Sequence, residues 1–172
     1  MTTRAQNEVL LEGTALDTPR LSHENHGTRF YRFLLEVPRL SGQADVLPIL
    51  LPEQLLPAVA KMVPLRIRGQ LRSFNNRSGV GSRLVLTVYA LEIFPGIEEA
   101  CNQILLTGSL CKPPVFRRTP LGRSICDLML AVSRRYGRAD YLPVIAWGQL
   151  AVRVSHLQVG DILALEGRVQ SR

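Results

Sequence analysis

Short runs of hydrophobic residues, separated by turns rich in glycine, proline and asparagine, predict an almost entirely β-stranded protein. Residues 1–95 contain five such runs and one short helix. The predicted strands are residues 8–16, 30–37, 46–51, 64–74 and 83–94, with a polar loop at 19–27, a turn at 41–43 and a flexible loop at 75–81. The helix begins at Pro52-Glu53, and its spacing would direct Leu55, Leu56, Val59 and Met62 inward.

The second half is organised around one run, Asp140 to Ala151. Its first part predicts a strand that ends at Gly148, after which Leu150, Val154 and Leu157 recur at helical spacing. A turn at residues 160–161 leads into a further strand at residues 162–169. A strand, a short helix and a strand in this order are typical of the middle of a small closed barrel of the OB type.

An internal repeat relates the two halves. A shift of 95 residues brings Asn7 onto Asn102, Gly13 onto Gly108, Pro19 onto Pro114, Gly27 onto Gly122, Leu35 onto Leu130, Val37 onto Val132 and Arg39 onto Arg134. After the helix the shift becomes 98, and Gly69 meets Gly167. We therefore predict an all-β fold of tandem OB barrels, each a five-stranded Greek-key barrel with a short helix after its third strand. The barrels would occupy residues 1–95 and 101–172, and the short linker between them would hold them as a fixed pair.

The second barrel lacks a counterpart of the strand at residues 83–94. An open barrel edge is a liability, because its unpaired backbone groups invite pairing with other chains. Either the chain is truncated after Arg172, or another chain covers the edge, and truncation is the interpretation we favour.

Six pieces of the second half, in order and with ordinary spacing, resemble the bacterial single-stranded DNA-binding protein (SSB) family. The pieces are Asn102 to Leu110, Pro114 with Arg117, Thr119 to Gly122, Leu130 to Arg135, Val144 to Ala151 and Glu166 to Arg172. The resemblance implies binding of single-stranded DNA without sequence preference. Most members of the family assemble four barrels, so two barrels per chain imply a homodimer. The flexible tail with an acidic tip that recruits partner proteins in this family is absent from the sequence.

The resemblance also implies where bases would stack. Stacking aromatic residues in the family lie at the end of the second strand and at both ends of the third, which are the positions of Tyr136, Tyr141 and Trp147 here. Repeat 1 has Ser41, Val46 and Pro52 at the corresponding positions. Repeat 1 is therefore expected to be mainly a structural or dimerising barrel, with weak backbone contacts to DNA.

Charge is concentrated in the second half. Residues 1–100 carry 11 basic and 10 acidic side chains, whereas residues 101–172 carry 10 and 4, and the whole chain has a net charge of +7. A basic surface favours an acidic partner such as nucleic acid. With the three aromatic residues, the arginines we expect to contact DNA are Arg117, Arg118, Arg123, Arg134, Arg135, Arg138, Arg168 and Arg172, of which Arg134, Arg135 and Arg138 flank Tyr136 on a hairpin.

Other kinds of chemistry find little support. The three cysteines, Cys101, Cys111 and Cys126, form no C-x-x-C pair and are interpreted as reduced residues of a cytosolic protein. We expect no metal site, because His23 and His26 lie in a polar loop, and no cofactor, because the sequence has no phosphate-binding loop. A polar N-terminus and the lack of an apolar run of about 18 residues argue against a signal peptide and a membrane span.

The sequence thus predicts a cytoplasmic, nucleoid-associated protein, not an enzyme, that protects single-stranded DNA in replication, recombination or repair and takes no small-molecule substrate. Two alternatives stay open. One is an accessory barrel protein similar to primosomal replication protein N, which acts mainly through protein contacts. The other is an OB module that binds RNA.

Overall fold

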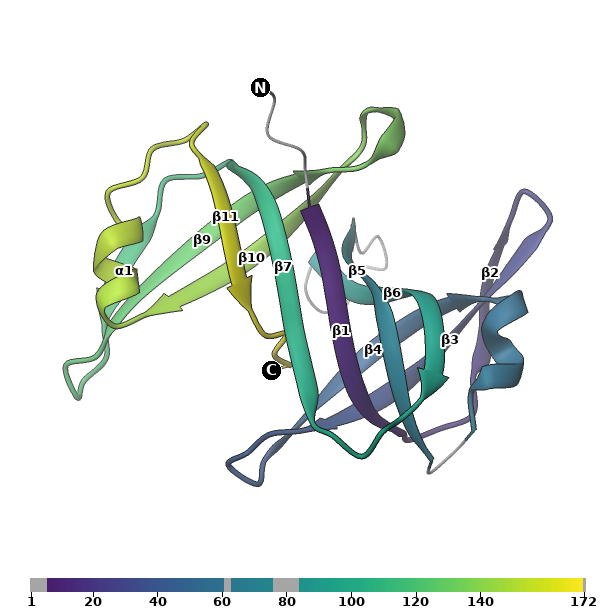
Figure 1. Ribbon diagram of the computed structural model, residues 1–172. Helices are drawn as coiled ribbons and strands as arrows, with labels where there is room; N and C mark the ends of the chain where they lie inside the picture. Colours follow the sequence, from purple (N-terminus) through teal and green to yellow (C-terminus); the bar gives the residue numbers. More distant parts are fainter. Residues whose placement is uncertain (1–5, 61–62, 76–83, 172) are drawn as a thin grey trace. The chain divides into compact units, whose positions relative to one another are not determined.

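The computed structural model describes residues 6–60, 63–75 and 84–171 (Figure 1). The chain is mostly β, as predicted, and divides into two compact units. One unit comprises Asn7–Leu105 together with Glu166–Arg172, and the other contains Leu106–Leu165. Within the described residues, no helix is long and apolar enough to cross a membrane.

Five strands of the first repeat close into a barrel. They are β1 (Gln6–Ala15), β3 (Thr28–Pro38), β4 (Ala44–Pro52), β5 (Pro64–Asn75) and β6 (Leu84–Pro95). Strand β1 pairs with β3 and β5, β3 pairs with β4, β4 pairs in parallel with β6, and β6 returns to β5. This closed ring with a single parallel pair is the pairing of an OB barrel. Its interior is filled by side chains with at most 1% exposure, including Leu11, Phe33, Leu35, Ile49 and Ile67.

The polar segment at residues 19–27 is a strand hairpin and not the loop that the sequence predicted. Strand β2 (Arg20–Asn25) pairs antiparallel with β3, and the chain reverses at His26 and Gly27, which both have positive φ values. The prediction was wrong because every residue of β2 is exposed. A strand that buries no side chain has no hydrophobic alternation by which the sequence could reveal it.

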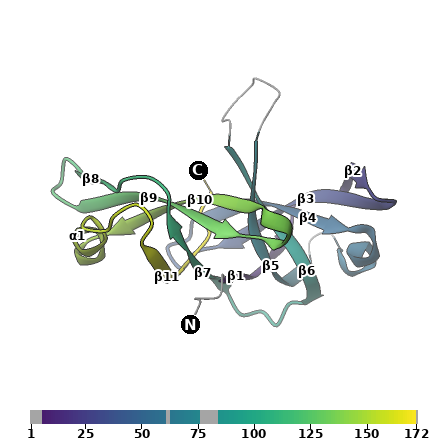
Figure 2. The same ribbon diagram turned by 90° about the horizontal axis from the view of Figure 1, so that it is seen from above.

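The second repeat forms strands β7 (Cys101–Leu110), β8 (Val115–Arg118), β9 (Ser124–Ser133), β10 (Ala139–Trp147) and β11 (Ile162–Gly167). Strand β9 pairs with β10 along nine residue pairs, and β8 pairs with the other edge of β9 near its start. Helix α1 (Gln149–Val154) contacts β9 and β10 (Figures 1 and 2).

Both helices differ in detail from the prediction. The predicted inward face of the second helix included Leu150, but Leu150 is 55% exposed, and Ala151 and Val154 are the buried residues. The helix of the first repeat is a 3-10 helix, η1 (Glu53–Ala58), which contains no buried residue. Leu55 and Leu56 are only half-buried, and Met62 lies outside the described residues, as does most of the predicted loop at 75–81.

The sequence repeat recurs as repeated contacts. The Asn7 side chain bonds both backbone groups of Leu71, at 2.7 and 2.9 Å, and Asn102 bonds both backbone groups of Val169, at 2.8 and 2.9 Å. The backbone at Gly13 passes close to the carbonyl of Glu36, and Gly108 is related in the same way to Ala131. These pairs obey the shifts of 95 and 98 residues, so the two halves share an arrangement and not only a residue pattern.

The linker is attached to the first barrel by one carboxylate. Glu12 is 5% exposed and accepts hydrogen bonds from the backbone amides of Ile97 and Glu99, at 2.9 and 2.7 Å. It also forms an ion pair with Arg66, with 3.1 Å between Nε and Oε1. Burial on its own would raise the pKa of Glu12, but these bonds together hold that pKa below its ordinary value. The carboxylate therefore stays ionised and fixes residues 97–99 to strand β1.

We expect the substitution Gly13→Ala to lower the free energy of unfolding by about 1–3 kcal/mol, because a methyl group there would collide with the backbone carbonyl of Glu36. Backbone cannot move aside as a flexible side chain can. Gly167→Ala is the matched control, since a Cβ at Gly167 would meet no atom within 4 Å. Urea unfolding of the two variants measures the difference, and equal midpoints would contradict the close approach.

Candidate nucleic-acid interface

Strand β10 presents its aromatic residues to solvent. Its side chains alternate, with Asp140, Leu142 and Ala146 buried and Tyr141 and Trp147 exposed by 49% and 46%. Successive side chains of a strand point to opposite faces, so Tyr141 and Trp147, six residues apart, lie on one face. We call the exposed side of β8, β9 and β10 that carries them the outer face.

The register of the three strands places an arginine and the tryptophan on the outer face, on either side of Ile125. Trp147 lies opposite Ile125 of β9, and Arg117 of β8 lies opposite the same Ile125 from the other side. Arg117 forms an ion pair with Asp127, with 2.8 Å between Nε and Oδ2, and still exposes 52% of its side chain. The hydrogen bond from Arg117 to Asp127 and the charge of Asp127 raise the pKa of Arg117. Arg117 is thus a permanent cation on the outer face, two strands away from Trp147.

A tight turn positions a second arginine, Arg123, over the ring of Trp147. The backbone amide of Thr119 bonds the carbonyl of Arg123 at 2.9 Å, the amide of Arg123 bonds Thr119 Oγ1 at 3.0 Å, and Gly122 supplies the positive φ that the turn requires. The Arg123 guanidinium then lies 5.0 Å from the centroid of the Trp147 ring. A guanidinium at this distance is attracted to the ring face. Its planar set of N–H donors also suits a phosphate.

The hairpin between β9 and β10 carries the third predicted aromatic residue. The amide of Arg134 bonds the carbonyl of Arg138 at 2.7 Å and closes the hairpin. Tyr136 is at its tip in the left-handed region, with φ 65°, and is 96% exposed. Arg135 and Arg138 beside it are also exposed. The tip therefore offers one ring and two cations to solvent.

Arg134 has a different position from its neighbours. Its Nε lies 3.1 Å from Oδ2 of Asp140, which is fully buried, and only 22% of the Arg134 side chain is exposed. Arg39 and Asp45 form the equivalent ion pair in the first repeat, at the base of the equivalent hairpin. The guanidinium of Arg134 is thus held at the base of the hairpin, and its contact with DNA stays a prediction.

The remaining predicted arginines are dispersed. Arg118 lies opposite Ser124, one position along β8 from Arg117, and therefore points away from the outer face. Arg168 bonds Gln170 at 3.3 Å in the C-terminal segment, which belongs to the other compact unit. Arg172 lies outside the described residues.

Sequence reasoning missed part of the outer face. Ile145 is 43% exposed between Tyr141 and Trp147, and Val115 is 57% exposed beside Arg117. Both add apolar surface on which a flat base can rest. Spacing in the sequence could have identified both residues. Ile145 is an even number of residues from Tyr141 and Trp147 in β10, and Val115 is two residues from Arg117 in β8. Residues an even number apart in a strand share a face.

The described part of the chain was also compared with the requirements of a metal site and of a reactive thiol. There, no three His, Cys, Asp or Glu side chains converge in a way that could hold a metal ion. All three cysteines are free thiols. Burial, followed by the charge of Asp127, raises the pKa of Cys126, so this thiol is kept protonated and unreactive.

Comparison with known proteins agrees with this geometry. Residues 101–172 match the profile of the single-strand binding protein family. The chain is 41% identical over 80 residues to a single-stranded DNA-binding protein of Thermus aquaticus and 32% identical over 78 residues to single-stranded DNA-binding protein A of Bacillus subtilis. These alignments cover 44% and 41% of this chain, and 30% and 45% of the relatives, so the chain matches less than half the length of either.

The solved structures extend the likeness to both repeats. The crystal structure of the wild-type single-stranded DNA-binding protein from Thermus aquaticus has a TM-score of 0.82 and 28% identity, covering 98% of this chain and 86% of that one. A deletion mutant of the same protein gives a TM-score of 0.81, also at 28% identity, covering 97% of this chain and 87% of that one. The likeness in fold therefore spans both repeats of this chain.

Proposed function

We propose that this chain is a member of the bacterial single-strand binding protein family and binds single-stranded DNA without sequence preference, because residues 101–172 match the profile of that family. The bound DNA would be protected during replication, recombination or repair. The role is one of binding without catalysis. A homodimer with four barrels stays a prediction of the family resemblance.

The observation that carries this proposal is the outer face of the second repeat. It combines a half-exposed indole ring, a half-exposed phenol ring and two arginines, Arg123 over the indole ring and Arg117 two strands away from it. Non-specific binding of a single strand requires rings on which bases stack and cations along the phosphate path. Both are available on the outer face, where strand pairing positions the rings and Arg117, and the turn at residues 119–123 positions Arg123.

Titration with oligothymidine tests the proposal, because Trp147 is the single tryptophan of the chain. We expect its fluorescence to be strongly quenched on binding, since a stacked base perturbs the indole directly. Binding should weaken with rising salt, by about 0.7 log units of affinity per log unit of salt for each phosphate neutralised. An oligouridine of the same length serves as the comparison ligand.

The outcomes separate the proposal from its alternatives. Quenching that weakens with salt supports binding of single-stranded DNA at the outer face. Equal affinity for the two oligonucleotides would favour an RNA-binding or general single-strand role. Absence of quenching, together with absence of binding in a gel-shift assay, would overturn the proposal and favour a barrel protein that acts through protein contacts.

A further inference from the structure

The second barrel has two strand edges that no described strand covers. In the first repeat, β6 closes the barrel by pairing antiparallel with β5 and in parallel with β4. The counterparts of β5 and β4 in the second repeat are β11 and β10 (Figure 1). Within the described residues, β11 pairs only with β7, and β10 pairs only with β9. We call the remaining edges of β10 and β11 the open side of the second barrel.

Core residues of β11 are less buried than their counterparts in β5. Leu65 and Ile67 of β5 pair with β6 and are 2% and 0% exposed. The shift of 98 residues relates them to Leu163 and Leu165 of β11, which are only partly buried. The side chains are of the same kind in both strands, so the difference in burial comes from the strand that covers them.

The edge of β10 shows the same difference at the register position that β6 covers in the first repeat. Ile49 of β4 lies opposite Val88 of β6 and is fully buried, whereas its counterpart Val144 is partly exposed. Two residues earlier in the same strands, Leu47 and Leu142 are 3% and 0% exposed. The second barrel is therefore well packed at Leu142 and loses burial at the open side.

Gly167 at the end of β11 leaves room for a neighbouring strand. Its counterpart Gly69 lies opposite Ala90 of β6, and a Cβ on Gly69 would come within 2.1 Å of the carbonyl oxygen of Tyr89. The first repeat thus requires a glycine, because the backbone of β6 passes close to it. A Cβ on Gly167 would meet no atom within 4 Å. A strand added in the position of β6 would give this glycine the same role.

We propose that the open side binds an extended segment of a separate polypeptide, which adds to the second barrel as a strand parallel to β10 and antiparallel to β11. The chemical class of this ligand follows from β6, which buries Val88 and Ala90, two residues apart, to 1% and 0% exposure. The ligand has small or β-branched apolar residues at alternate positions. Its backbone pairs with both edges, and its apolar side chains contact Val144, Leu163 and Leu165.

A second copy of this chain is a poorer donor than another polypeptide. The strands of the first repeat with the required pattern, β4, β5 and β6, already have two strand partners each. A second copy could donate one of them only by opening its own first barrel, and it would lose as much pairing as it gained. Unpaired edges with apolar side chains invite pairing with other chains. A strand from a different polypeptide fills the open side without that loss.

The test uses the full chain and a labelled synthetic peptide with the sequence of Leu84–Pro95, with charged residues added at its ends for solubility. Fluorescence anisotropy should show saturable binding of one peptide per chain. Hydrogen exchange should slow at backbone amides of β10 and β11 when the peptide is bound. The same peptide with Val88→Asp should bind about tenfold more weakly or worse, because it would bury a carboxylate in an apolar core.

Substitution Gly167→Ala in the protein tests the position of the added strand. It should leave the stability of the free chain unchanged, since the methyl group meets no atom there. In the complex the methyl group would collide with the backbone of the peptide, so the affinity should fall about tenfold or more. Ala164→Val is the matched control, because Ala164 is exposed and lies three residues away, on the opposite face of β11. It should bind the peptide as tightly as the unmodified chain.

Three results would overturn the proposal. The first is the absence of peptide binding to the unmodified chain. The second is equal binding by the Gly167→Ala variant, which would mean that the peptide exchanges with β6 of the first barrel. The third is self-association of the free chain that protects the same amides, which would assign the open side to a second copy. Titration with oligothymidine reports on the proposed function separately, so none of these results would decide it.

Discussion

Replacing Trp147 with alanine should weaken binding of a short oligothymidine about tenfold, because stacking contributes about 1–3 kcal/mol per base and 1.4 kcal/mol is one factor of ten. The side chain is half-exposed, and Trp147 lies opposite Ile125 on the neighbouring strand. Its removal therefore takes away a binding platform with little loss of core packing. Fluorescence anisotropy of a labelled oligomer measures the effect, since the variant has no tryptophan.

Two controls make this result specific. Trp147→Phe keeps a flat ring and should retain most of the affinity. Phe94→Ala removes a ring of similar exposure, 43%, from strand β6 of the first repeat. This variant should bind the short oligomer as tightly as the unmodified chain. Unfolding midpoints of all variants should stay within a few degrees of the unmodified chain. A loss of affinity in Phe94→Ala equal to that in Trp147→Ala would contradict the assignment of the outer face.

The effect should increase when Tyr141 is removed as well. Six residues of strand separate Tyr141 from Trp147, a distance of about 20 Å at 3.3 Å per residue. Substitutions this far apart add with little coupling. We therefore expect the double variant Tyr141→Ala/Trp147→Ala to lose about 100-fold in affinity for an oligomer long enough to contact both rings. A double variant no weaker than Trp147→Ala would place Tyr141 outside the DNA path.

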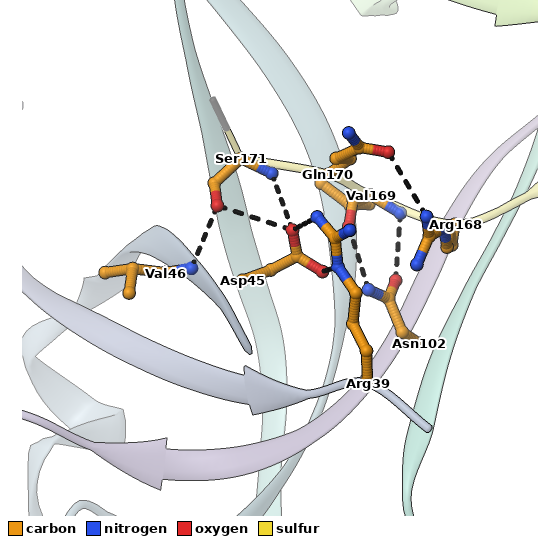
Figure 3. A network of polar contacts seen from close by, with 8 residues as sticks. All are labelled: Arg39, Asp45, Val46, Asn102, Arg168, Val169, Gln170 and Ser171. Carbon is orange, nitrogen blue, oxygen red and sulfur yellow. Dashed lines mark hydrogen bonds and ion pairs between the residues drawn. The ribbon is translucent and has the colours of Figure 1, made fainter. Parts of the chain in front are cut away.

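The largest expected loss of stability comes from Asp45. Figure 3 shows its carboxylate between Arg39 and Ser171. The carboxylate accepts hydrogen bonds from Nε and Nη2 of Arg39, at 2.8 and 2.5 Å. It also accepts hydrogen bonds from the backbone amide and the hydroxyl of Ser171, at 3.0 and 3.3 Å. Asp45 is fully buried, whereas 19% of the Arg39 side chain is exposed. Asp45→Asn should lower the free energy of unfolding at pH 7 by about 3 kcal/mol, since breaking a buried ion pair leaves a charge without its counterion.

The same pair predicts a dependence on pH. The hydrogen bond from Arg39 holds the pKa of Asp45 below its ordinary value, against the opposing effect of burial, and Ser171 lowers the pKa further. A carboxyl whose pKa is depressed in the folded state contributes its full stabilisation above the pKa of the unfolded chain, about 3.9. The contribution is lost as the pH falls through the folded-state pKa. The difference between Asp45→Asn and the unmodified chain should thus be large at pH 7 and shrink below about pH 4.

Urea unfolding at several pH values measures this difference. Asp127→Asn is the matched control, because Asp127 pairs with Arg117 on the exposed side of the sheet, where 39% of the carboxylate side chain is accessible. Exposed pairs contribute about 1 kcal/mol or less. A stability difference for Asp45→Asn that is the same at pH 3 and pH 7 would contradict the ionic origin of the effect.

The two repeats show how one sheet can present a ring in two ways. Trp147 and Phe30 belong to different strands of their barrels, yet each is one member of the same cross-strand pair. The pleat sends both members of such a pair to the same side. A search for rings at matching sequence positions therefore finds none in the first repeat, although the barrel carries Phe30 and Tyr89 on its surface.

The sequence by itself determined the β class and the internal repeat. These features depend on short-range patterns, namely glycines at close backbone approaches and apolar runs of strand length. The resemblance to the family pointed to Tyr141 and Trp147, and the structure exposes both on β10 beside the buried Leu142 and Ala146. The resemblance to the single-strand binding family is of the same kind, because it rests on residues within 72 positions of one another.

Only the tertiary structure decided which arginines are exposed and which are held in ion pairs with buried carboxylates. Arg134 and Arg135 are neighbours in sequence, but strand pairing buries Asp140 beside the first and leaves the second in solvent. Arg123 reaches Trp147, and His23, Phe30, Tyr89 and Arg72 form a row, because barrel closure brings strands together that are far apart in the chain. Such contacts depend on register between strands, and no local pattern of hydrophobic and polar residues records that register.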